Sequence, residues 1–398
     1  MKRKFSSPLK ISFVLVILLG FYFQPSDAGF SENPRKIVVF NKWFYKEVDQ
    51  DVLLKKHGAV KIKHLKLING TAVHLSRQAE KALRRTDEVL RIDDDIVIHA
   101  TGKRDRKKPK NPQPPEELTW GVERVGADSV WGENTGSEIK VAILDTGIDL
   151  EHPDLQDNIK GDINVIKPKK SGNDDSGHGT HVAGIVAALD NEIGVIGTGP
   201  EISLFAVKVL DKKGRGWLSD LIDGLDWCID YGMQVVNMSF GSSADNESFH
   251  EVVIEAYEAG ITLVASAGNN GEYGGGIDYP ARYPETIAVS AIDETDGFAS
   301  FSSYGPEIDL TAPGVNVKST YKGSSYEIMN GTSMSAPHVT GIVALILKTP
   351  ASGYDIDNDG IWDPAEIIIK LKETAEILPV LHLHQQGAGL VRADRAAY

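Results

Sequence analysis

The sequence predicts an α/β protein in which a small α+β domain precedes a larger three-layer domain with a mainly parallel β-sheet. Three observations lead to this fold class. The chain has 398 residues, enough for one domain of about 250 to 300 residues and a smaller one. A basic, proline-containing break in composition divides the chain at residues 101–115. After the break, apolar strands alternate with helical segments, which is typical of parallel sheets covered by helices.

The first residues have the composition of a signal peptide. Four Lys and Arg residues within positions 2–10 precede the apolar run Ile11–Phe23, and Ser26-Asp27-Ala28 follows it. The run is too short to cross a membrane, because the hydrocarbon core requires about 20 residues. We therefore expect residues 1–28 to be removed by cleavage after Ala28, which yields a secreted protein without a membrane anchor.

Residues 29–101 are predicted to form the small domain. Asn69-Gly70 separates two apolar runs and so predicts a hairpin turn. The expected order is β-α-β-β-α-β, which is the order of ferredoxin-like domains. Its elements are a strand Lys36–Phe40, a helix Lys46–His57, hairpin strands Val60–Ile68 and Thr71–Leu75, a helix Gln78–Arg85 and a strand Val89–His99.

Residues 102–115 are predicted to be an exposed linker, and residues 116–398 the large domain. Active residues in such domains lie at the carboxyl ends of the parallel strands. The expected strands are Ile139–Leu144, Leu204–Leu210, Val235–Met238, Thr262–Ala265 and Ile287–Ala291.

The charge is unevenly distributed along the chain. Of the formal net charge of -14, residues 1–101 contribute 18 - 11 = +7 and the rest contributes 24 - 45 = -21. So acidic a main body argues against a nucleic-acid partner. Some of its carboxylates are candidates to hold cations. We expect a monomer.

Cysteine usage excludes an intramolecular disulfide, since Cys228 is the only cysteine. It lies in an apolar helical stretch, where a buried thiol without chemistry is expected. Stability in an exported protein of this kind must come from another source, and bound metal is the first candidate.

Three segments supply the groups that acyl transfer requires. Asp145 ends an apolar strand, His178 begins a helix between glycines, and Ser333 lies in a turn that leads into an apolar helix. Acyl transfer needs a hydroxyl nucleophile, a base that takes its proton, and a carboxylate that orients the base. The three segments provide one of each.

These strings, Val141–Gly147, Ser176–His181 and Asn330–His338, resemble the signature motifs of the subtilisin family of serine proteases, in the same order Asp, His, Ser. The resemblance runs from about Trp120 to Ala397. It implies a serine endopeptidase acting on protein or peptide substrates, with Ser333 as nucleophile, His178 as base and then acid, and Asp145 as orienting carboxylate. The nearby Ser335, His181 and Asp149 are predicted to be structural. The layout is similar to that of calcium-dependent subtilisins of hyperthermophilic archaea, which implies thermostability.

The resemblance also implies an oxyanion site and a substrate cleft. Residues 265–271 resemble the oxyanion motif and indicate Asn269, together with the Ser333 backbone N–H; Asn270 is the alternative. An exposed strand edge can hold an extended substrate. The implied substrate-binding residues are Ser239, Phe240 and Gly241 on one side and Ala267 and Gly268 on the other.

Asp278 departs from the family pattern, because many members have a small residue at the base of the first specificity pocket. We hypothesise that its carboxylate favours Lys or Arg immediately before the scissile bond. The alternative is that a loop insertion turns Asp278 to solvent.

Residues 355–366 fit the calcium-loop pattern D-x-D-x-D-G-x5-E. Gly360 permits the sharp turn of such loops. The alternative is an acidic loop that caps a helix Pro364–Thr374. The predicted ligands are Asp355, Asp357, Asp359, the carbonyl of Ile361, Asp363 and Glu366.

A second calcium site is implied by resemblance to the high-affinity calcium loop of the family. A weaker cation site at Glu307 and Asp309, near Ala281 and Tyr283, is a further candidate. At least two Ca²⁺ ions are therefore expected, both structural. The predicted ligands of the second site are Asn191, Asp154 and the carbonyls of Leu189, Ile193 and Val195, with Glu116 as an additional candidate.

Residues 29–101 resemble the family's propeptide, which assists folding and inhibits the protease by leaving its C-terminal tail in the cleft. The match places self-cleavage at Thr101-Gly102, whereas a basic pocket would prefer Arg104 or Arg106. A catalytically silent calcium-binding protein on a protease fold is the competing hypothesis. An esterase is disfavoured because Ser333 does not lie in a G-x-S-x-G elbow.

Overall fold

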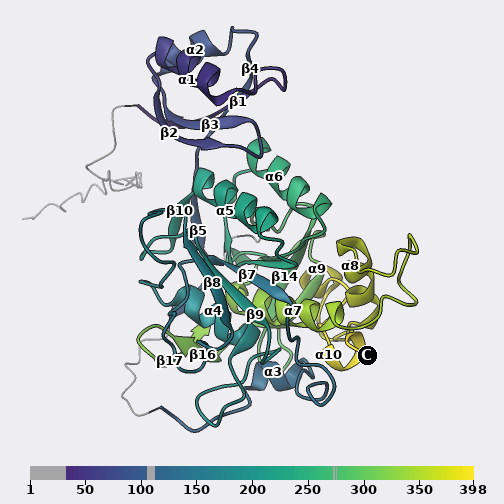
Figure 1. Ribbon diagram of the computed structural model, residues 1–398. Helices are drawn as coiled ribbons and strands as arrows, with labels where there is room; N and C mark the ends of the chain where they lie inside the picture. The colour runs from purple at the N-terminus through teal and green to yellow at the C-terminus, as the bar shows by residue number, and fades with distance from the viewer. Residues whose placement is uncertain (1–32, 105–112, 272–273, 275) are drawn as a thin grey trace, which may run out of the picture.

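The computed structural model describes residues 33–104, 113–271, 274 and 276–398. The predicted signal peptide lies outside these residues. None of the helices in the described part of the chain combines the length and apolarity that a membrane crossing requires. The described residues form a small N-terminal domain stacked on a large α/β domain (Figure 1).

The large domain is built on a parallel sheet, as predicted. Seven strands lie in the order β15-β14-β13-β11-β7-β9-β8. Two of them, β8 and β15, were not predicted, because polar residues and a proline interrupt their apolar pattern. The bounds are β7 Lys140–Asp145, β8 Ile159–Asn164, β9 Ser203–Lys208, β11 Val235–Met238, β13 Thr262–Ser266, β14 Thr286–Ile292 and β15 Leu310–Pro313.

Helices cover both faces of this sheet and complete the three predicted layers (Figure 1). Helices α4 (His178–Ala187) and α7 (Thr332–Leu347) pack on one face, and α5 (Leu218–Asp230) and α6 (Glu247–Glu258) cover the other. Every residue of α4 is buried, and so is every residue of α7 except Leu347; both helices are mostly apolar, and their polar residues gather toward their first turns. Shorter helices lie at the periphery: α3 Trp120–Arg124, α8 Pro364–Thr374, α9 Leu383–Gln386 and α10 Ala393–Ala396.

The N-terminal domain has the predicted β-α-β-β-α-β order and an antiparallel sheet ordered β2-β3-β1-β4. Its β1 strand shows why both faces of this sheet are covered. Val38 and Phe40 pack under the domain's own helices, while Ile37 and Val39 belong to the core shared with α5 and α6. The bounds are β1 Arg35–Phe40, α1 Glu47–Lys56, β2 Val60–Leu65, β3 Gly70–His74, α2 Arg77–Leu83 and β4 Val89–Asp94.

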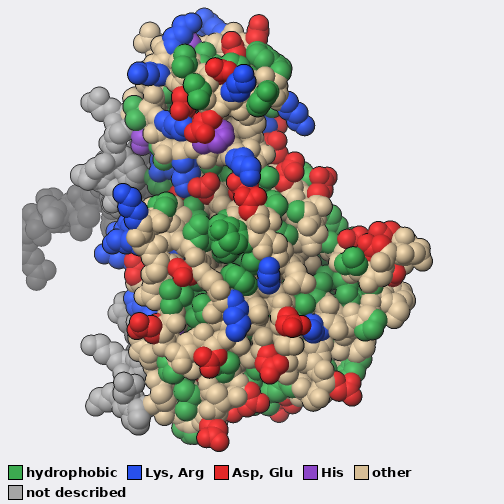
Figure 2. Space-filling view, in the orientation of Figure 1, with side chains coloured by type: hydrophobic (Ala, Val, Ile, Leu, Met, Phe, Trp, Pro, Cys, Tyr) green, Lys and Arg blue, Asp and Glu red, His purple; other side chains and the backbone are tan. Residues whose placement is uncertain are grey.

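Opposite charges line the contact between the two domains. Lys63 of β2 pairs with Asp220 at 2.7 Å and with Asp223 at 2.8 Å, both on α5. Arg91 of β4 pairs with Glu251 of α6 at 2.5 Å. Figure 2 shows acidic and basic side chains interspersed where the domains meet. The contrast between a positive N-terminal segment and an acidic body is thus realised as direct ion pairs.

The prediction of one strand from Val89 to His99 was wrong. Strand β4 ends at Asp94, and β5 (Val97–Ala100) leaves the N-terminal sheet to lie between β10 (Arg215–Trp217) and β12 (Phe240–Gly241) of the large domain. Asp95 separates the two strands because its buried carboxylate accepts hydrogen bonds from Ser219 at the start of α5.

The segment that follows β5 is also paired, although an exposed linker was predicted from Gly102. Strand β6 (Lys103–Arg104) pairs with β17 (Ser325–Asn330), which forms a hairpin with β16 (Val317–Tyr321). Residues 105–112 of the predicted linker lie outside the described residues. Residues 97–104 therefore run through the large domain as an extended chain.

Candidate active site

Asp145 and His178 meet at one end of the parallel sheet. Asp145 is the last residue of β7, and His178 is the first residue of α4. The Nδ1 atom of His178 lies 2.8 and 2.9 Å from the two carboxylate oxygens of Asp145. Burial would lower the pKa of His178, but the charges of Asp145 and, to a smaller extent, Asp174 raise it above its usual value.

Ser333 is held at the start of α7 by an exchange of hydrogen bonds with Ser239. Pro337 lies inside α7 and has no N–H, so the carbonyl of Ser333 four residues earlier lacks its helical donor. The hydroxyl of Ser239 donates to this carbonyl at 3.0 Å instead. In return, Oγ of Ser333 donates to the Ser239 carbonyl at 2.9 Å.

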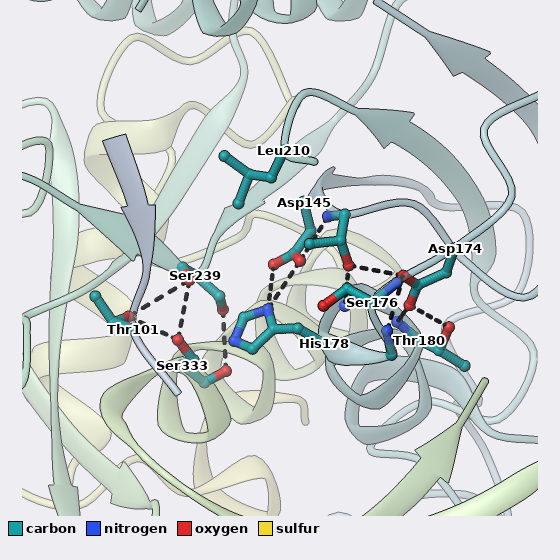
Figure 3. Close-up of polar contacts among 12 residues, drawn as sticks. Thr101, Asp145, Asp174, Ser176, His178, Thr180, Leu210, Ser239 and Ser333 are labelled. Atoms are coloured by element: carbon teal, nitrogen blue, oxygen red, sulfur yellow. Dashed lines mark hydrogen bonds and ion pairs between the residues drawn. The ribbon is translucent and has the colours of Figure 1, made fainter. Parts of the chain in front are cut away.

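Residues 97–102 occupy the cleft beside Ser333. Strand β5 pairs with an edge strand on each side, and the Ala100 amide donates to the Gly214 carbonyl at 2.9 Å. Beyond it, the Thr101 amide donates to the Ser239 carbonyl at 3.3 Å, and Oγ1 of Thr101 lies 2.6 Å from Oγ of Ser333. The chain is bound as an extended peptide (Figure 3).

The Thr101 carbonyl accepts a hydrogen bond from a side-chain amide that is itself held in place. Nδ2 of Asn269 donates to the Thr101 carbonyl oxygen. The other end of the Asn269 side chain is fixed, because Oδ1 accepts the amide and the hydroxyl of Thr332, each at 3.0 Å. A methyl group on Gly331 would lie 2.5 Å from this carbonyl oxygen, so only glycine leaves room for it.

Gly102, on the far side of the same peptide bond, faces the histidine. A methyl group on Gly102 would lie 2.9 Å from Nε2 of His178. Within the described residues, this buried nitrogen has no hydrogen-bond partner. The Thr101-Gly102 bond thus has an amide donor on its carbonyl and an unpaired imidazole nitrogen beside Gly102, while the Ser333 hydroxyl contacts the Thr101 side chain.

Comparison with known proteins agrees with this geometry. The pattern of the Subtilase family matches residues 136–389. Subtilisin E of Bacillus subtilis (strain 168) is 36% identical over 405 residues, covering 98% of this chain and 99% of the relative. Subtilisin BL of Lederbergia lenta is 44% identical over 282 residues, covering 71% of this chain and 99% of the relative. An alkaline protease of Shouchella clausii is 37% identical over 401 residues, covering 97% and 98%.

The chain belongs to the subtilase family. It is a subtilisin-type serine endopeptidase with a propeptide, and the N-terminal α+β domain is consistent with that propeptide. The alignment with Subtilisin E spans nearly the whole of both chains, so the match is not restricted to the protease domain.

The other candidate polar residues of this subtilase have different partners. Nε2 of His181 lies 3.1 Å from the carbonyls of Val317 and Glu327, and burial lowers the pKa of His181 to about 3. Ser335 is buried, and its Oγ lies beside Gly314 without a hydrogen-bond partner among the described residues. The carboxylate of Asp149 accepts backbone amides of the β16-β17 turn, at 2.7 Å from Gly323 and 3.1 Å from Ser324.

Asp278 is buried between the predicted walls of the first specificity pocket, so the alternative that it turns to solvent is wrong. Its side chain is 8% exposed and sits between the two predicted walls. A methyl group would lie 2.6 Å from its Cβ if placed on Gly241, and 2.5 Å from its Oδ2 if placed on Gly268. Asn270 donates to Oδ1 at 3.0 Å, and burial raises the pKa of Asp278 to about 6. The amide of Asn270 is therefore directed at Asp278.

The residues predicted for the second calcium site come together around a buried carboxylate. Asp154 is fully buried, and its Oδ1 has no hydrogen-bond partner among the described residues, while Oδ2 accepts the Val195 amide at 3.1 Å. Burial raises the pKa of Asp154 to about 7. Oε1 of Glu116 accepts the Asn191 amide at 2.6 Å, which brings a second carboxylate to the loop. An unpaired buried oxygen beside further oxygen ligands fits a calcium ion.

The predicted loop at residues 355–366 is only partly assembled. Carboxylate oxygens of Asp355, Asp357 and Asp359 lie within 4.8 Å of one another, and the loop that carries these residues precedes α8 (Figure 1). Asp363 and Glu366 instead form a capping box at the start of α8. The alternative of a helix-capping loop is therefore realised for these two residues, while the first three keep the chemistry of a calcium site.

The weaker cation site suggested at Glu307 and Asp309 is occupied by cations of the chain itself. Oε1 of Glu307 lies 3.1 Å from Nε of Arg282, and Oδ1 of Asp309 lies 2.6 Å from Nζ of Lys372. Since each carboxylate is already paired with a basic side chain, a bound cation is not needed to neutralise it.

One buried carboxylate beside the site was missed in the sequence. Asp174 lies in the loop before α4 and accepts hydrogen bonds from residues on both sides of the Asp145–His178 pair. A carboxylate four residues before the histidine was the available signal, but its spacing alone does not distinguish it from the adjacent Asp175.

Proposed function

We propose that this subtilase is secreted as an inactive precursor and hydrolyses peptide bonds through an acyl-enzyme formed on Ser333. The single observation that carries the proposal is the position of Thr101-Gly102. Oγ1 of Thr101 lies 2.6 Å from Oγ of Ser333, the Thr101 carbonyl accepts a hydrogen bond from Asn269, and Gly102 faces His178. Asp145, His178 and Ser333 are the proposed catalytic triad, and Asn269 is the proposed oxyanion donor.

The proposed reaction begins when Oγ of Ser333 turns from the Ser239 carbonyl toward Nε2 of His178. His178 takes the hydroxyl proton as Oγ attacks the Thr101 carbonyl carbon, and Asn269 stabilises the resulting oxyanion. His178 then gives the proton to the Gly102 nitrogen as the peptide bond breaks. Water, deprotonated by His178, hydrolyses the ester on Ser333. Asp145 stabilises the imidazolium in both steps.

We propose maturation by cleavage at Thr101-Gly102, with the propeptide at residues 29–101, the linker at 102–115 and the protease domain at 116–398. Pairing of β5 with β10 and β12 supports this bond over the alternatives. Arg104 pairs with Met329 beyond Ser333, and Arg106 lies outside the described residues. After cleavage, the propeptide tail remains in the cleft and inhibits it.

A fluorophosphonate probe tests the enzyme proposal. Reaction with the matured protein is expected to modify a peptide that contains Ser333, as identified by mass spectrometry. A catalytically silent calcium-binding protein would take up no probe and would cleave no peptide after refolding with calcium. The presence of all four proposed catalytic residues argues against that alternative.

We propose that Asp278 gives the first specificity pocket a preference for Lys and Arg. Changing Asp278 to Asn should lower kcat/KM for a Lys or Arg substrate relative to a Phe substrate by about 10- to 100-fold, because the pocket loses its buried charge. In the wild type this ratio should rise with pH through about 6, as the carboxyl group ionises. Chromogenic tetrapeptides that differ only in the residue before the scissile bond measure it.

Asp293→Asn, in a surface turn, is the control for this variant, because its carboxylate accepts only local hydrogen bonds from Thr295 and Gly297. The preference for Lys and Arg would be ruled out if the wild type cleaved basic and Phe substrates with nearly equal kcat/KM and Asp278→Asn left this ratio unchanged.

We propose that calcium bound at the Asp154 loop and at Asp355, Asp357 and Asp359 stabilises the protease domain. A site at 1,000 times its Kd contributes about 4 kcal/mol, so a chelator should lower Tm by on the order of 10 °C. Asp154→Asn should remove the response of its loop to calcium. Without calcium, this variant should melt no lower than the wild type, because it lacks the uncompensated buried charge.

Differential scanning fluorimetry with CaCl₂ or EDTA measures both effects, and Asp157→Asn, on the exposed surface nearby, is the matched control. Equal Tm values with and without the chelator would contradict the calcium proposal. Thermostability remains a proposal of the same kind, since the relatives named above are bacterial subtilisins and the similarity to archaeal enzymes stays a prediction.

A further inference from the structure

Asp174 is a buried carboxylate that the proposed reaction does not use. It is 4% exposed and accepts hydrogen bonds from the described residues around it at both oxygens. Oδ1 accepts the Ser176 amide at 2.8 Å, the Gly177 amide at 2.9 Å and the Thr146 hydroxyl at 2.9 Å. Oδ2 accepts the amide and the hydroxyl of Thr180 at 3.0 and 2.6 Å. Figure 3 shows it on the side of His178 that faces away from Ser333.

Besides the two loop amides, the donors are Thr146 and Thr180, which adjoin two separate elements that each carry one member of the triad. Thr146 directly follows Asp145 at the end of β7, and Thr180 lies in the first turn of α4, two residues after His178. Thr146 also connects them itself, because its Oγ1 accepts the Gly179 amide at 2.9 Å while it donates to Asp174. The carboxylate therefore joins the end of β7 to the start of α4.

We propose that Asp174 is a positioning residue that fixes Asp145 and His178 in their mutual geometry. The inference rests on the proposed function of these two residues. A neutral amide cannot replace the carboxylate, because its NH₂ group would face N–H and O–H donors on one side. The isosteric change to Asn should therefore weaken the hydrogen bonds that connect the end of β7 to the start of α4, without opening a cavity.

The charge of Asp174 acts in the same direction as its hydrogen bonds. The charged and titratable groups around His178 are Asp145 on β7, Asp174 in the preceding loop and His181 on α4. Lys208 on β9 donates to the Thr146 carbonyl at 2.5 Å and pairs with Asp175 at 2.8 Å. Since Asp174 contributes to the raised pKa of His178, its neutralisation should lower that pKa.

Two measurements test the proposal. The first is the first-order rate of self-cleavage of the full-length precursor between pH 5 and 9. The second is kcat and KM of the matured enzyme over the same pH range. Asp174→Asn should lower the cleavage rate and kcat by about 10- to 100-fold and leave KM within about two-fold, as expected when only the positioning of catalytic groups is lost. The acid limb of both pH profiles should move to lower pH, because His178 loses its proton more readily.

Asp149→Asn is the matched control, since Asp149 is a buried carboxylate of the same region whose Oδ2 accepts the amides of Gly323 and Ser324. It should keep the wild-type acid limb and kcat. If Asp174→Asn does not fold, Thr146→Val decides, because it removes the connecting hydroxyl and leaves the bonds from Asp174 to α4 intact. Thr146→Ser should restore the rate.

The proposal is overturned if Asp174→Asn keeps the wild-type kcat, if its acid limb does not move, or if Asp149→Asn has the same effects. It is also overturned if Thr146→Val is as active as Thr146→Ser. An inactive wild type would instead contradict the proposed function, so the two failures are distinguishable.

Discussion

A precursor with Ser333 changed to Ala is expected to remain uncut. The Thr101-Gly102 bond would still lie in the cleft, held by the flanking strands and Asn269, but without an oxygen nucleophile. Removal of the nucleophile in a subtilisin lowers kcat by about a million-fold, so the variant should show no measurable turnover of peptides. Gel electrophoresis would show one band where the wild type gives propeptide and protease.

Ser335→Ala is the control for this change, because Ser335 is buried on the same helix and its Oγ lies beside Gly314 without a hydrogen-bond partner among the described residues. It should mature and turn over peptides as the wild type does. Normal maturation of the Ser333→Ala precursor in the absence of another protease would contradict the assignment of the nucleophile.

Changing Asn269 to Ala should lower kcat by about 100- to 1,000-fold and leave KM nearly unchanged, since the amide donor acts on charge that develops during the reaction. The side chain is already oriented, with Oδ1 bound to Thr332 and Nδ2 on the Thr101 carbonyl. Steady-state kinetics with a chromogenic peptide measure the split between kcat and KM.

Asn270→Ala supplies the comparison, because the Asn270 amide donates to Asp278 and not to the Thr101 carbonyl. It should retain most of kcat and change the preference for basic residues. A loss of kcat in Asn270→Ala equal to that in Asn269→Ala would show that the oxyanion donor had been misassigned.

The sequence was most informative where function requires a short motif. Asp145, His178 and Ser333 each lie at the end of a strand or the start of a helix, and their local patterns predicted these elements. The parallel sheet followed from apolar strands that alternate with helices. Strand β8 was missed because Lys160 and Asp162 interrupt its apolar pattern.

Features that depend on partners distant in the sequence were not predictable. The break between β4 and β5 depends on Asp95 binding Ser219, 124 residues away. Likewise, Asp309 forms an ion pair with Lys372, which is too distant in the sequence for a local pattern to predict the contact. The burial of Asp278 between Gly241 and Gly268 could not be predicted from the sequence of its own loop. The sequence therefore left open whether Asp278 lines the pocket or faces solvent. Asp174 shows the same limit, since its role depends on a hydrogen bond from Thr146, 28 residues earlier at the end of β7.

The calcium loops fall between these cases. A pattern of acidic residues predicted the cluster of Asp355, Asp357 and Asp359, yet the same string also encodes a capping box. Geometry separates the two uses, because Glu366 accepts the backbone amides of Ile356 and Asp363.

The central claim is that the chain presents its own Thr101-Gly102 bond as the first substrate. N-terminal sequencing of the protease that forms when the purified wild-type precursor refolds with calcium tests it most directly. The protease is predicted to begin at Gly102, and the released propeptide to end at Thr101. A protease that begins at Asp105 or Lys107, after cleavage behind Arg104 or Arg106, would contradict it.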